Sequence, residues 1–307
     1  MTLDRPALVQ FARGSISRGS KSFALASRLF DRTTRERVWL LYAWCRHCDD
    51  LADGQSYGGT MEAVDDPETR IALIRERTAM ALAGEATGDS AFDALGLVAR
   101  ECGLSKDQID AVVEGFALDA ADWHPRSEAD LYRYCYHVAG AVGIMMAIVM
   151  GVRRDDEATL DRACDLGMAF QLANIARDIE EDDAAGRCYL PDEWQAKLDI
   201  GPGEHMKPHN RGRLTLMARW LCDEAELYEA SAKVGASTLP FRSRWAVLAA
   251  AGIYGDIGRK VRAAGDHAWD HRLYVNRWEK ARRVARAFVE AWRNDPVALP
   301  RDGLWSR

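Results

Sequence analysis

The chain has 307 residues, of which 48% are hydrophobic, 29% charged and 9% aromatic. This composition excludes a disordered or fibrous protein, and the length is sufficient for one large domain or two ordinary ones with a sizeable core. The formal net charge is −6, which argues against a nucleic-acid partner, because contact with a phosphate backbone requires a surplus of basic residues.

Nine segments with helical periodicity follow one another, separated by short breaks rich in Gly, Pro and Asp. No alternating strand pattern persists, and 185–210 is the one long irregular stretch. We therefore expect a single all-α domain over residues 1–307, with helices around a central apolar cavity. The predicted helices are 34–53, 68–83, 90–102, 105–122, 127–150, 157–184, 211–235, 241–264 and 272–294.

Several helix ends carry recognisable capping residues. Thr33 with Glu36 is a predicted capping box at the start of the first helix, and Gly54 is its predicted end. Ser105 with Gln108 repeats the capping-box pattern at the start of the predicted helix 105–122. These signals support the helical interpretation independently of the apolar periodicity.

Targeting signals and disulfides are not evident. The seven cysteines lack the spacing of a disulfide framework, so we expect reduced thiols and a cytoplasmic location. The first residues have an early acid and no apolar run, unlike a secretory signal peptide. The most apolar segment, 138–152, contains three glycines and is shorter than the roughly 18–20 residues of a membrane span. Any membrane contact is therefore expected to be peripheral.

Acidic residues gather at two places, each near the end of a predicted helix. Asp49 and Asp53 lie four positions apart in the sequence. Asn174, Asp178 and Asp182 also follow one another at intervals of four positions. Residues at this spacing share one helix face. Like charges at this spacing destabilise a helix, and acids near its C-terminus oppose the macrodipole. Violations of local rules are expected at functional sites, and a bound cation would remove both penalties.

The donor types indicate which cation. Oxygen ligands without paired histidines favour a hard ion such as Mg²⁺, which uses one or two carboxylates and completes its shell with water and substrate phosphate. Arg46 precedes Asp49 by three residues and Arg177 adjoins Asp178, and arginine is well suited to diphosphate oxygens. An acidic cluster at one helix end is usually solvated surface, but two such clusters with adjacent arginines predict a metal–phosphate clamp.

The two acidic segments and three further motifs resemble the squalene/phytoene synthase family of head-to-head prenyl transferases, in particular its bacterial phytoene synthases. The resemblance runs nearly end to end. One departure is Leu51-Ala52, where the family often has larger aliphatic residues. In the acidic run Glu180–Asp183, Asp182 is chosen as the second metal-binding acid because it lies four positions after Asp178. The motifs are 19–23 (GSKSF), 41–50 (LYAWCRHCDD), 134–140 (YCYHVAG), 174–182 and 186–191 (GRCYLP).

The family implies an isoprenoid synthase fold and a reaction. Two geranylgeranyl diphosphates condense 1–1′ through prephytoene diphosphate to phytoene, the first committed step of C40 carotenoid biosynthesis. The implied cofactor is Mg²⁺, with Mn²⁺ as the alternative ion, and no NADPH is required. The implied partners are the substrate, a peripheral membrane contact and a downstream carotenoid desaturase, with no nucleic acid.

The resemblance also assigns roles to residues. The catalytic set comprises four acids and one tyrosine that assists proton loss or diphosphate departure: Asp49, Asp53, Asp178, Asp182 and Tyr134. The expected metal ligands are Asp49, Asp53, Asn174, Asp178 and Asp182. The expected diphosphate-binding residues are Ser20, Lys21, Ser22, Tyr42, Arg46, Gln171, Arg177, Tyr254 and Arg272. The carbocations require an apolar, water-free cavity, for which the candidates are Phe23, Tyr42, Val138, Ala139, Gly143, Met146 and Leu172.

Other signals have simpler interpretations. Cys45 and Cys48 lack a second cysteine pair and sit inside a predicted helix, which favours packing over redox or zinc chemistry. His47 and His137 are expected to be structural. The basic segment 277–293 is either a solvated helix face or a contact with anionic lipid headgroups.

Three other function classes are weaker. A ferritin-like di-iron protein requires Glu-x-x-His on two helices, and a nucleotide enzyme requires a Walker or Gly-rich dinucleotide motif; neither occurs. A helical assembly factor that has lost the chemistry predicts damage in one acidic motif, and both are intact. Within the family, the alternative is a synthase that uses C15 diphosphates to make squalene or dehydrosqualene, because cavity depth sets chain length.

Overall fold

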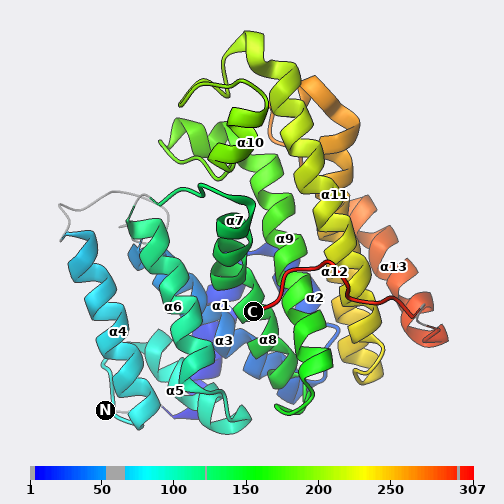
Figure 1. The fold of residues 1–307 in the computed structure, drawn as a ribbon. Coiled ribbons are helices and arrows are strands. Elements are labelled where there is room, and N and C mark those ends of the chain that lie inside the picture. The colour runs from blue at the N-terminus through cyan, green and yellow to red at the C-terminus, as the bar shows by residue number, and fades with distance from the viewer. Residues whose placement is uncertain (1–3, 53–65, 122, 296–297) are drawn as a thin grey trace. The chain divides into compact units, whose positions relative to one another are not determined.

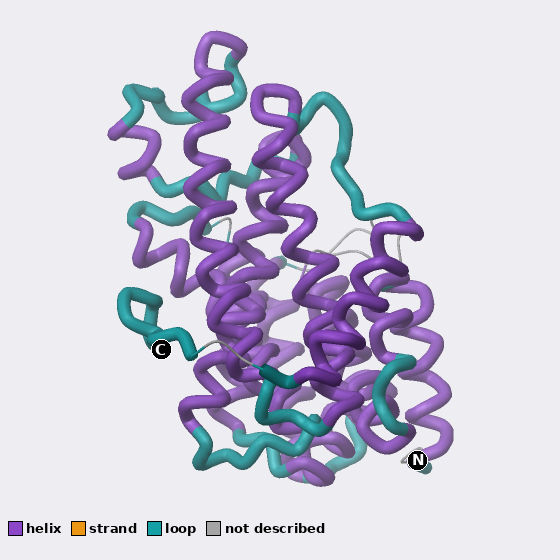
Figure 2. The backbone as a smooth tube through the Cα atoms, turned by 90° about the vertical axis from the view of Figure 1, so that its right-hand side faces the viewer, coloured by secondary structure: helices purple, strands orange, loops and turns teal. Residues whose placement is uncertain are grey.

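The structure is a computed structural model that describes residues 4–52, 66–121, 123–295 and 298–307. Throughout these four ranges the regular secondary structure is helical, and no strand is present (Figures 1 and 2). The chain divides into two compact units. Unit 1 comprises residues 1–123 and 144–156, and unit 2 comprises 124–143 and 157–307. The predicted fold class is confirmed.

Unit 1 is built around its longest helix. α3 packs against α1 and α5, and more narrowly against α2, α4 and α6. Its fully buried residues include Leu40, Leu41 and Trp44, which place the centre of α3 in the core of this unit. The helices are α1 (Arg5–Gly19), α2 (Lys21–Ser27), α3 (Arg32–Ala52), α4 (Pro67–Ala83), α5 (Ser90–Cys102), α6 (Lys106–Ala120) and the later part of α8 (Ala141–Val149).

Unit 2 is organised by a long helix pair. α9 packs along α11, both helices pack against α12, and α13 packs on α12 (Figure 1). The elements are α7 (Glu128–Cys135), the π-turn η1 (Tyr136–Gly140), the start of α8, α9 (Glu157–Ala184), α10 (Asp192–Lys197), η2 (Pro208–Asn210), α11 (Arg211–Ala236), α12 (Phe241–Ala264), η3 (Gly265–His267) and α13 (Arg277–Arg293). This arrangement places the acidic end of α9 where the loops after α9 and α12 can reach it.

One predicted helix, 127–150, is interrupted in the structure. It divides into α7, η1 and α8, because the backbone makes a π-turn at Tyr136–Gly140. The turn lies where the chain approaches α9 very closely: a Cβ on Gly167 would lie 2.2 Å from the carbonyl oxygen of Ala139. A Cβ on Gly143, a predicted cavity residue, would lie 2.3 Å from the carbonyl oxygen of Ala163. Gly143 therefore serves backbone contact between helices.

The capping predictions have mixed outcomes. The Ser105–Gln108 capping box is confirmed. The Thr33–Glu36 box is wrong: the side chain of Asp31 accepts from the Thr34 backbone N–H at 3.0 Å, and Glu36 instead accepts from two arginines. An aspartate two residues earlier satisfies the helix end, so α3 begins at Arg32. Gly54 lies outside the described residues.

The remaining differences concern short elements. Sequence periodicity does not reveal α1 or α2, and the irregular stretch 185–210 contains α10 and η2. The final helix begins at Arg277 because Asn276 forms a capping box with Glu279, five residues after the predicted start. The described helices include none that is both long and apolar enough to cross a bilayer.

The C-terminal segment, residues 298–307, is anchored to unit 2. Arg301 makes three hydrogen bonds to Asp165 of α9: Nε to Oδ2 at 2.9 Å, Nη2 to Oδ1 at 2.8 Å and Nε to Oδ1 at 3.3 Å. Asp165 is fully buried and also accepts from the Ser231 hydroxyl at 2.6 Å. The ring of Trp305 packs at 5.4 Å from Tyr136 of η1. The segment therefore covers the π-turn.

Candidate functional site

Two carboxylate sets lie near helix ends, one in each unit. The first set is Asp49 and Asp50 with Arg46, near the end of α3 in unit 1. The second set is Asn174, Asp178 and Asp182 with Arg177, in the last three turns of α9 in unit 2. Asp53, the remaining predicted acid of the first set, lies outside the described residues. The prediction that these residues occupy helices is confirmed for the described ones.

In the first set, one arginine neutralises two carboxylates. Arg46 donates from Nη1 to Asp49 at 3.1 Å and from Nη2 to Asp50 at 2.5 Å. The Asp50 side chain is only 8% exposed, whereas that of Asp49 is 46% exposed. Asp49 is therefore the carboxylate in this pair that is accessible to a ligand, and Asp50 is the buried anchor of Arg46.

Tyr42 joins the first set to the start of α2. A Cβ on Gly19 would lie 2.4 Å from the Tyr42 hydroxyl oxygen, so only glycine permits this approach. The next residue, Ser20, caps α2 by accepting from the Phe23 backbone N–H at 3.3 Å, and Lys21 begins the helix. Burial raises the pKa of Tyr42 to about 12, which keeps its hydroxyl protonated as a hydrogen-bond donor. The structure thus places Ser20 and Lys21 directly after the glycine that approaches Tyr42; the side chain of Ser22 is not described.

In the second set, two arginines neutralise Asp178. Arg177 donates from Nε to Asp178 Oδ1 at 2.7 Å, and Arg272 lies 3.2 Å from the same oxygen. Arg272 also pairs with Glu181 and comes from the loop between η3 and α13. That loop is held to α9 by Trp269, whose indole N–H donates to the Ala176 carbonyl at 3.0 Å.

Asp182 has a different environment. Burial, followed by repulsion from Asp178, raises the pKa of Asp182 to about 7. The positive charge of Arg187 acts in the opposite direction. Arg187 is brought there by the end of α9, where Gly186 adopts a φ of +76° and the Arg187 backbone N–H donates to the Asp182 carbonyl at 2.8 Å. This is a Schellman-type helix end. Arg187 is a site residue that spacing did not identify, although Gly186 signals the turn.

The other predicted residues of unit 2 lie on α7, α9 and α12. Tyr254 of α12 stacks on Phe170, with 4.1 Å between ring centroids. Gln171 and Asn174 lie on α9 itself, both partly buried. Tyr134 of α7 is only 3% exposed and stacks on Tyr189 at 4.8 Å. Tyr189 belongs to the 186–191 motif, for which the sequence supplied no role.

The interpretations of His47 and of the cysteines can be compared with the structure. His47 Nε2 lies 2.8 Å from Asp89, a residue that caps α5, which supports a structural role. All seven cysteines are free, and burial raises the pKa of Cys45 to about 12, as expected for packing residues. His205, which the sequence analysis did not single out, is buried, and its Nε2 lies 3.2 Å from Asp183 near the end of α9.

The residues present are suitable for a hard cation shared with a ligand. Within the ranges that the structure describes, no three His, Cys, Asp or Glu side chains are grouped to hold an ion by themselves. Each set does offer one or two carboxylates and no histidine, which is the donor pattern for Mg²⁺ when phosphate oxygens complete the shell. The conflict between Asp178 and Asp182 is also what a divalent cation would relieve.

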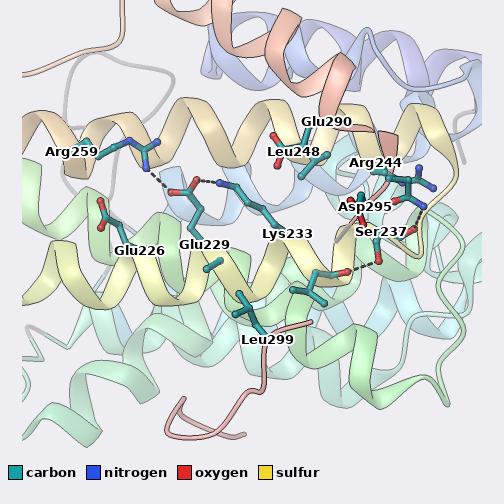
Figure 3. Close-up of a pocket in the computed structure, with 13 residues that line it drawn as sticks. Glu226, Glu229, Lys233, Ser237, Arg244, Leu248, Arg259, Glu290, Asp295 and Leu299 are labelled. Carbon is teal, nitrogen blue, oxygen red and sulfur yellow. Dashed lines mark hydrogen bonds and ion pairs between the residues drawn. The ribbon is translucent and has the colours of Figure 1, made fainter. Parts of the chain in front are cut away.

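A cavity of about 340 Å³ lies elsewhere in unit 2 and contains none of the predicted site residues (Figure 3). Buried Glu229 forms ion pairs with Lys233 at 2.7 Å and Arg259 at 3.0 Å. Arg244 donates to the carbonyl oxygens of Leu239 and Ala291. The charges of Glu229, Lys233 and Arg259 are thus paired within α11 and α12, and Arg244 ties helix ends together.

Comparison with known proteins identifies relatives across the chain. Residues 16–279 match the family model described as squalene/phytoene synthase. The chain is 44% identical to a phytoene synthase of Pseudescherichia vulneris and 46% identical to a 15-cis-phytoene synthase of Pantoea ananas, in each case over 99% of both chains. In fold it is similar to a dehydrosqualene synthase, with a TM-score of 0.83 and 24% identity over 94% of this chain and 98% of the other.

Proposed function

Because the chain belongs to the squalene/phytoene synthase family, we propose that it catalyses the phytoene synthase reaction. Two molecules of geranylgeranyl diphosphate are joined head to head through prephytoene diphosphate, and diphosphate is released with phytoene. The observation that carries this proposal is the 44–46% identity to two phytoene synthases over 99% of each chain. The two units are proposed to act as one catalytic domain over residues 1–307.

Divalent metal ions are the cofactor class for this type of prenyl transfer, and we propose Mg²⁺, with Mn²⁺ as a substitute. Asp49, Asp53, Asn174, Asp178 and Asp182 would hold it. When bound, the metal supplies Lewis-acid neutralisation of the leaving diphosphate. The chain's contribution is to provide oxygen ligands on two helices whose backbones are fixed by buried packing. No NADPH is proposed, because the reaction requires no reductant.

Cationic side chains are proposed to bind the substrate's diphosphate groups, each of which carries roughly two to three negative charges near neutral pH. Arg46, Arg177 and Arg272 already lie beside carboxylates, so they are positioned and charged before a ligand arrives. The further contacts proposed are Ser20, Lys21, Ser22, Tyr42, Gln171 and Tyr254. Guanidinium groups suit this role because they donate two parallel hydrogen bonds to phosphate oxygens.

Tyr134 is proposed to assist proton loss or diphosphate departure. Its burial and its stacking on Tyr189 support this role, because a fixed ring holds the hydroxyl at one position. The proposed location is the cytoplasm with a peripheral membrane contact, and the proposed downstream partner is a carotenoid desaturase.

The test is a product assay with the purified full chain. Geranylgeranyl diphosphate should yield phytoene with Mg²⁺ and none with EDTA. Asp178→Asn should lower the rate about 100-fold or more, since loss of a metal ligand removes several kcal/mol of transition-state stabilisation. Glu180→Gln, at an exposed carboxylate of the same helix, is the matched control and should stay within twofold. Metal-independent phytoene, or full activity of Asp178→Asn, would overturn the metal assignment; C30 products alone would overturn the substrate.

A further inference from the structure

The outward face of α13 exposes large apolar side chains. Trp278 and Trp292 are 71% and 73% exposed, and Phe288 and Val289 are 43% and 45% exposed. The helix packs on α12 through its opposite face, where Ala287 and Ala291 are buried. Surface aromatic residues that occur singly are ordinary, but four large apolar residues on one helix face require an explanation.

These residues form one stripe rather than a scatter. At about 100° per residue, Phe288, Trp292, Trp278 and Val289 fall within an arc of about 100°. The two tryptophans are 14 positions apart in the sequence, which corresponds to about 21 Å along the helix. We call these four residues the apolar stripe. Its width and length are those of a surface that lies flat against a partner.

Arginines follow one edge of the apolar stripe. At the same 100° per residue, the positions that follow Val289 around the helix are basic. Within about 60° of arc beyond Val289 lie Arg282, Arg293 and Arg286. None of the three has an ion pair or hydrogen bond to any other residue that the structure describes. By contrast, Arg283, which faces α12, is paired with Asp256. The outward arginines are therefore available cations.

The sign of the charge on α13 differs from that of the chain. The helix carries six basic and two acidic residues, a net charge of +4, whereas the whole chain has a net charge of −6. The apolar surface also extends onto the start of α12, because Phe288 packs edge-on against Phe241 at 5.6 Å and Trp245 at 5.1 Å. An apolar face beside unpaired cations matches a partner that is both apolar and anionic.

We propose that the apolar stripe and its three arginines dock α13 in the plane of an anionic lipid bilayer. The aromatic residues would enter the boundary between headgroups and acyl chains, and the arginines would contact lipid phosphates. This inference rests on the proposed function in one respect: the substrate and product of that reaction are themselves lipids, which a bilayer stores. It adds the surface that contacts the membrane.

The test is co-sedimentation of the full chain with vesicles of phosphatidylcholine alone or with about 30% phosphatidylglycerol. Strong binding is expected only to the anionic vesicles. An arginine near such a surface contributes about fivefold in affinity, so the triple variant Arg282→Gln, Arg286→Gln, Arg293→Gln should lose roughly 100-fold. Trp278→Ser with Trp292→Ser should lose binding at unchanged charge. Arg32→Gln with Arg153→Gln changes two exposed arginines of unit 1 and should bind like the parent chain.

Circular dichroism of each variant checks folding, and phytoene formation from detergent-dispersed substrate checks catalysis. Active variants that no longer sediment with vesicles would support the docking surface. Equal binding by the parent chain and the α13 variants, or equal binding to neutral and anionic vesicles, would overturn it without affecting the proposed reaction. A parent dimer that Trp278→Ser with Trp292→Ser dissociates in sedimentation velocity would assign the stripe to a second copy of the chain instead.

Discussion

The anchor of the C-terminal segment allows a quantitative prediction, because it depends on a buried carboxylate. Asp165 is 0% exposed and receives three hydrogen bonds from Arg301 and one from Ser231. Arg301→Met removes all three charge-assisted bonds and leaves a buried carboxylate with one hydroxyl partner. Breaking such a pair costs about 3–5 kcal/mol. The remaining Ser231 bond and the 18% exposure of the Arg301 side chain favour the lower end, about 3 kcal/mol.

The assay is thermal unfolding at pH 7. With an unfolding entropy of about 2.1 cal/mol/K per residue, a loss of about 3 kcal/mol lowers the Tm of a chain of this length by about 5 °C. Arg153→Met, which breaks a fully exposed pair with Asp155, should leave the Tm unchanged. Adding Asp165→Asn to Arg301→Met should restore at least half the loss, because the buried site then carries no charge.

Two results would refute this reasoning. A Tm decrease below about 1 °C for Arg301→Met would mean that Asp165 is adequately stabilised without its arginine. A double variant no more stable than Arg301→Met would mean that the loss arises from packing of residues 298–307 and not from the unpaired charge.

Three further predictions test the helix contact, the ion pairs of α12 and the tyrosine stack. Gly167→Ala should destabilise by about 3 kcal/mol or abolish folding, because the added Cβ would meet the Ala139 carbonyl at 2.2 Å; Gly212→Ala, with open space around it, should stabilise by about 0.5–1 kcal/mol, and chemical denaturation measures both. Burial by itself would raise the pKa of Asp256. Hydrogen bonds from Arg283 and Arg259 outweigh burial, so the pKa of Asp256 lies below its ordinary value. The ionised Asp256 carboxylate stabilises the fold fully above the pKa that it has in the unfolded chain, and this stabilisation is lost as the pH falls through its pKa in the folded protein. Asp256→Asn should therefore destabilise the protein more at pH 7 than at pH 3.5. Equal destabilisation at both pH values would contradict this. Tyr189→Leu should lower the rate of phytoene formation about fivefold, since an aromatic pair contributes about 0.5–1.5 kcal/mol, whereas Tyr189→Phe keeps the stack and should stay within twofold; equal rates for both would exclude a positioning role.

Helices such as α3 and α5 could be predicted from sequence because each carries an apolar period of its own. α9 has little amphipathic period, and its end is indicated instead by the break at Gly186. α2 has only seven residues, too few for a periodic signal. α1 was missed although Asp4 caps it and Pro6 lies in its first turn. The π-turn could not be predicted, because it depends on the close approach of Gly167 to Ala139, a tertiary contact.

The carboxylates of the site and their adjacent arginines, Arg46 and Arg177, were predictable from local spacing, and the long-range partners were not. Spacing places Asn174, Asp178 and Asp182 on one face of α9, and α9 is helical throughout that range. The contact of Arg272 with Asp178 joins residues 94 positions apart, which no local pattern indicates. The same applies to His205 beside Asp183, where a loop returns to the end of α9.

The π-turn at Tyr136–Gly140 gives this part of the chain room for a one-residue deletion. A π-turn holds one residue more than the α-helix it interrupts, so removing one residue would let the backbone close into a regular α-helix while the residues that follow keep their phase. Gly143 would then still face the Ala163 carbonyl, at a place that admits no Cβ. A one-residue deletion in α9 before Gly167 has no such turn to absorb it; it would rotate the residues that follow by about 100° and turn Gly167 away from Ala139.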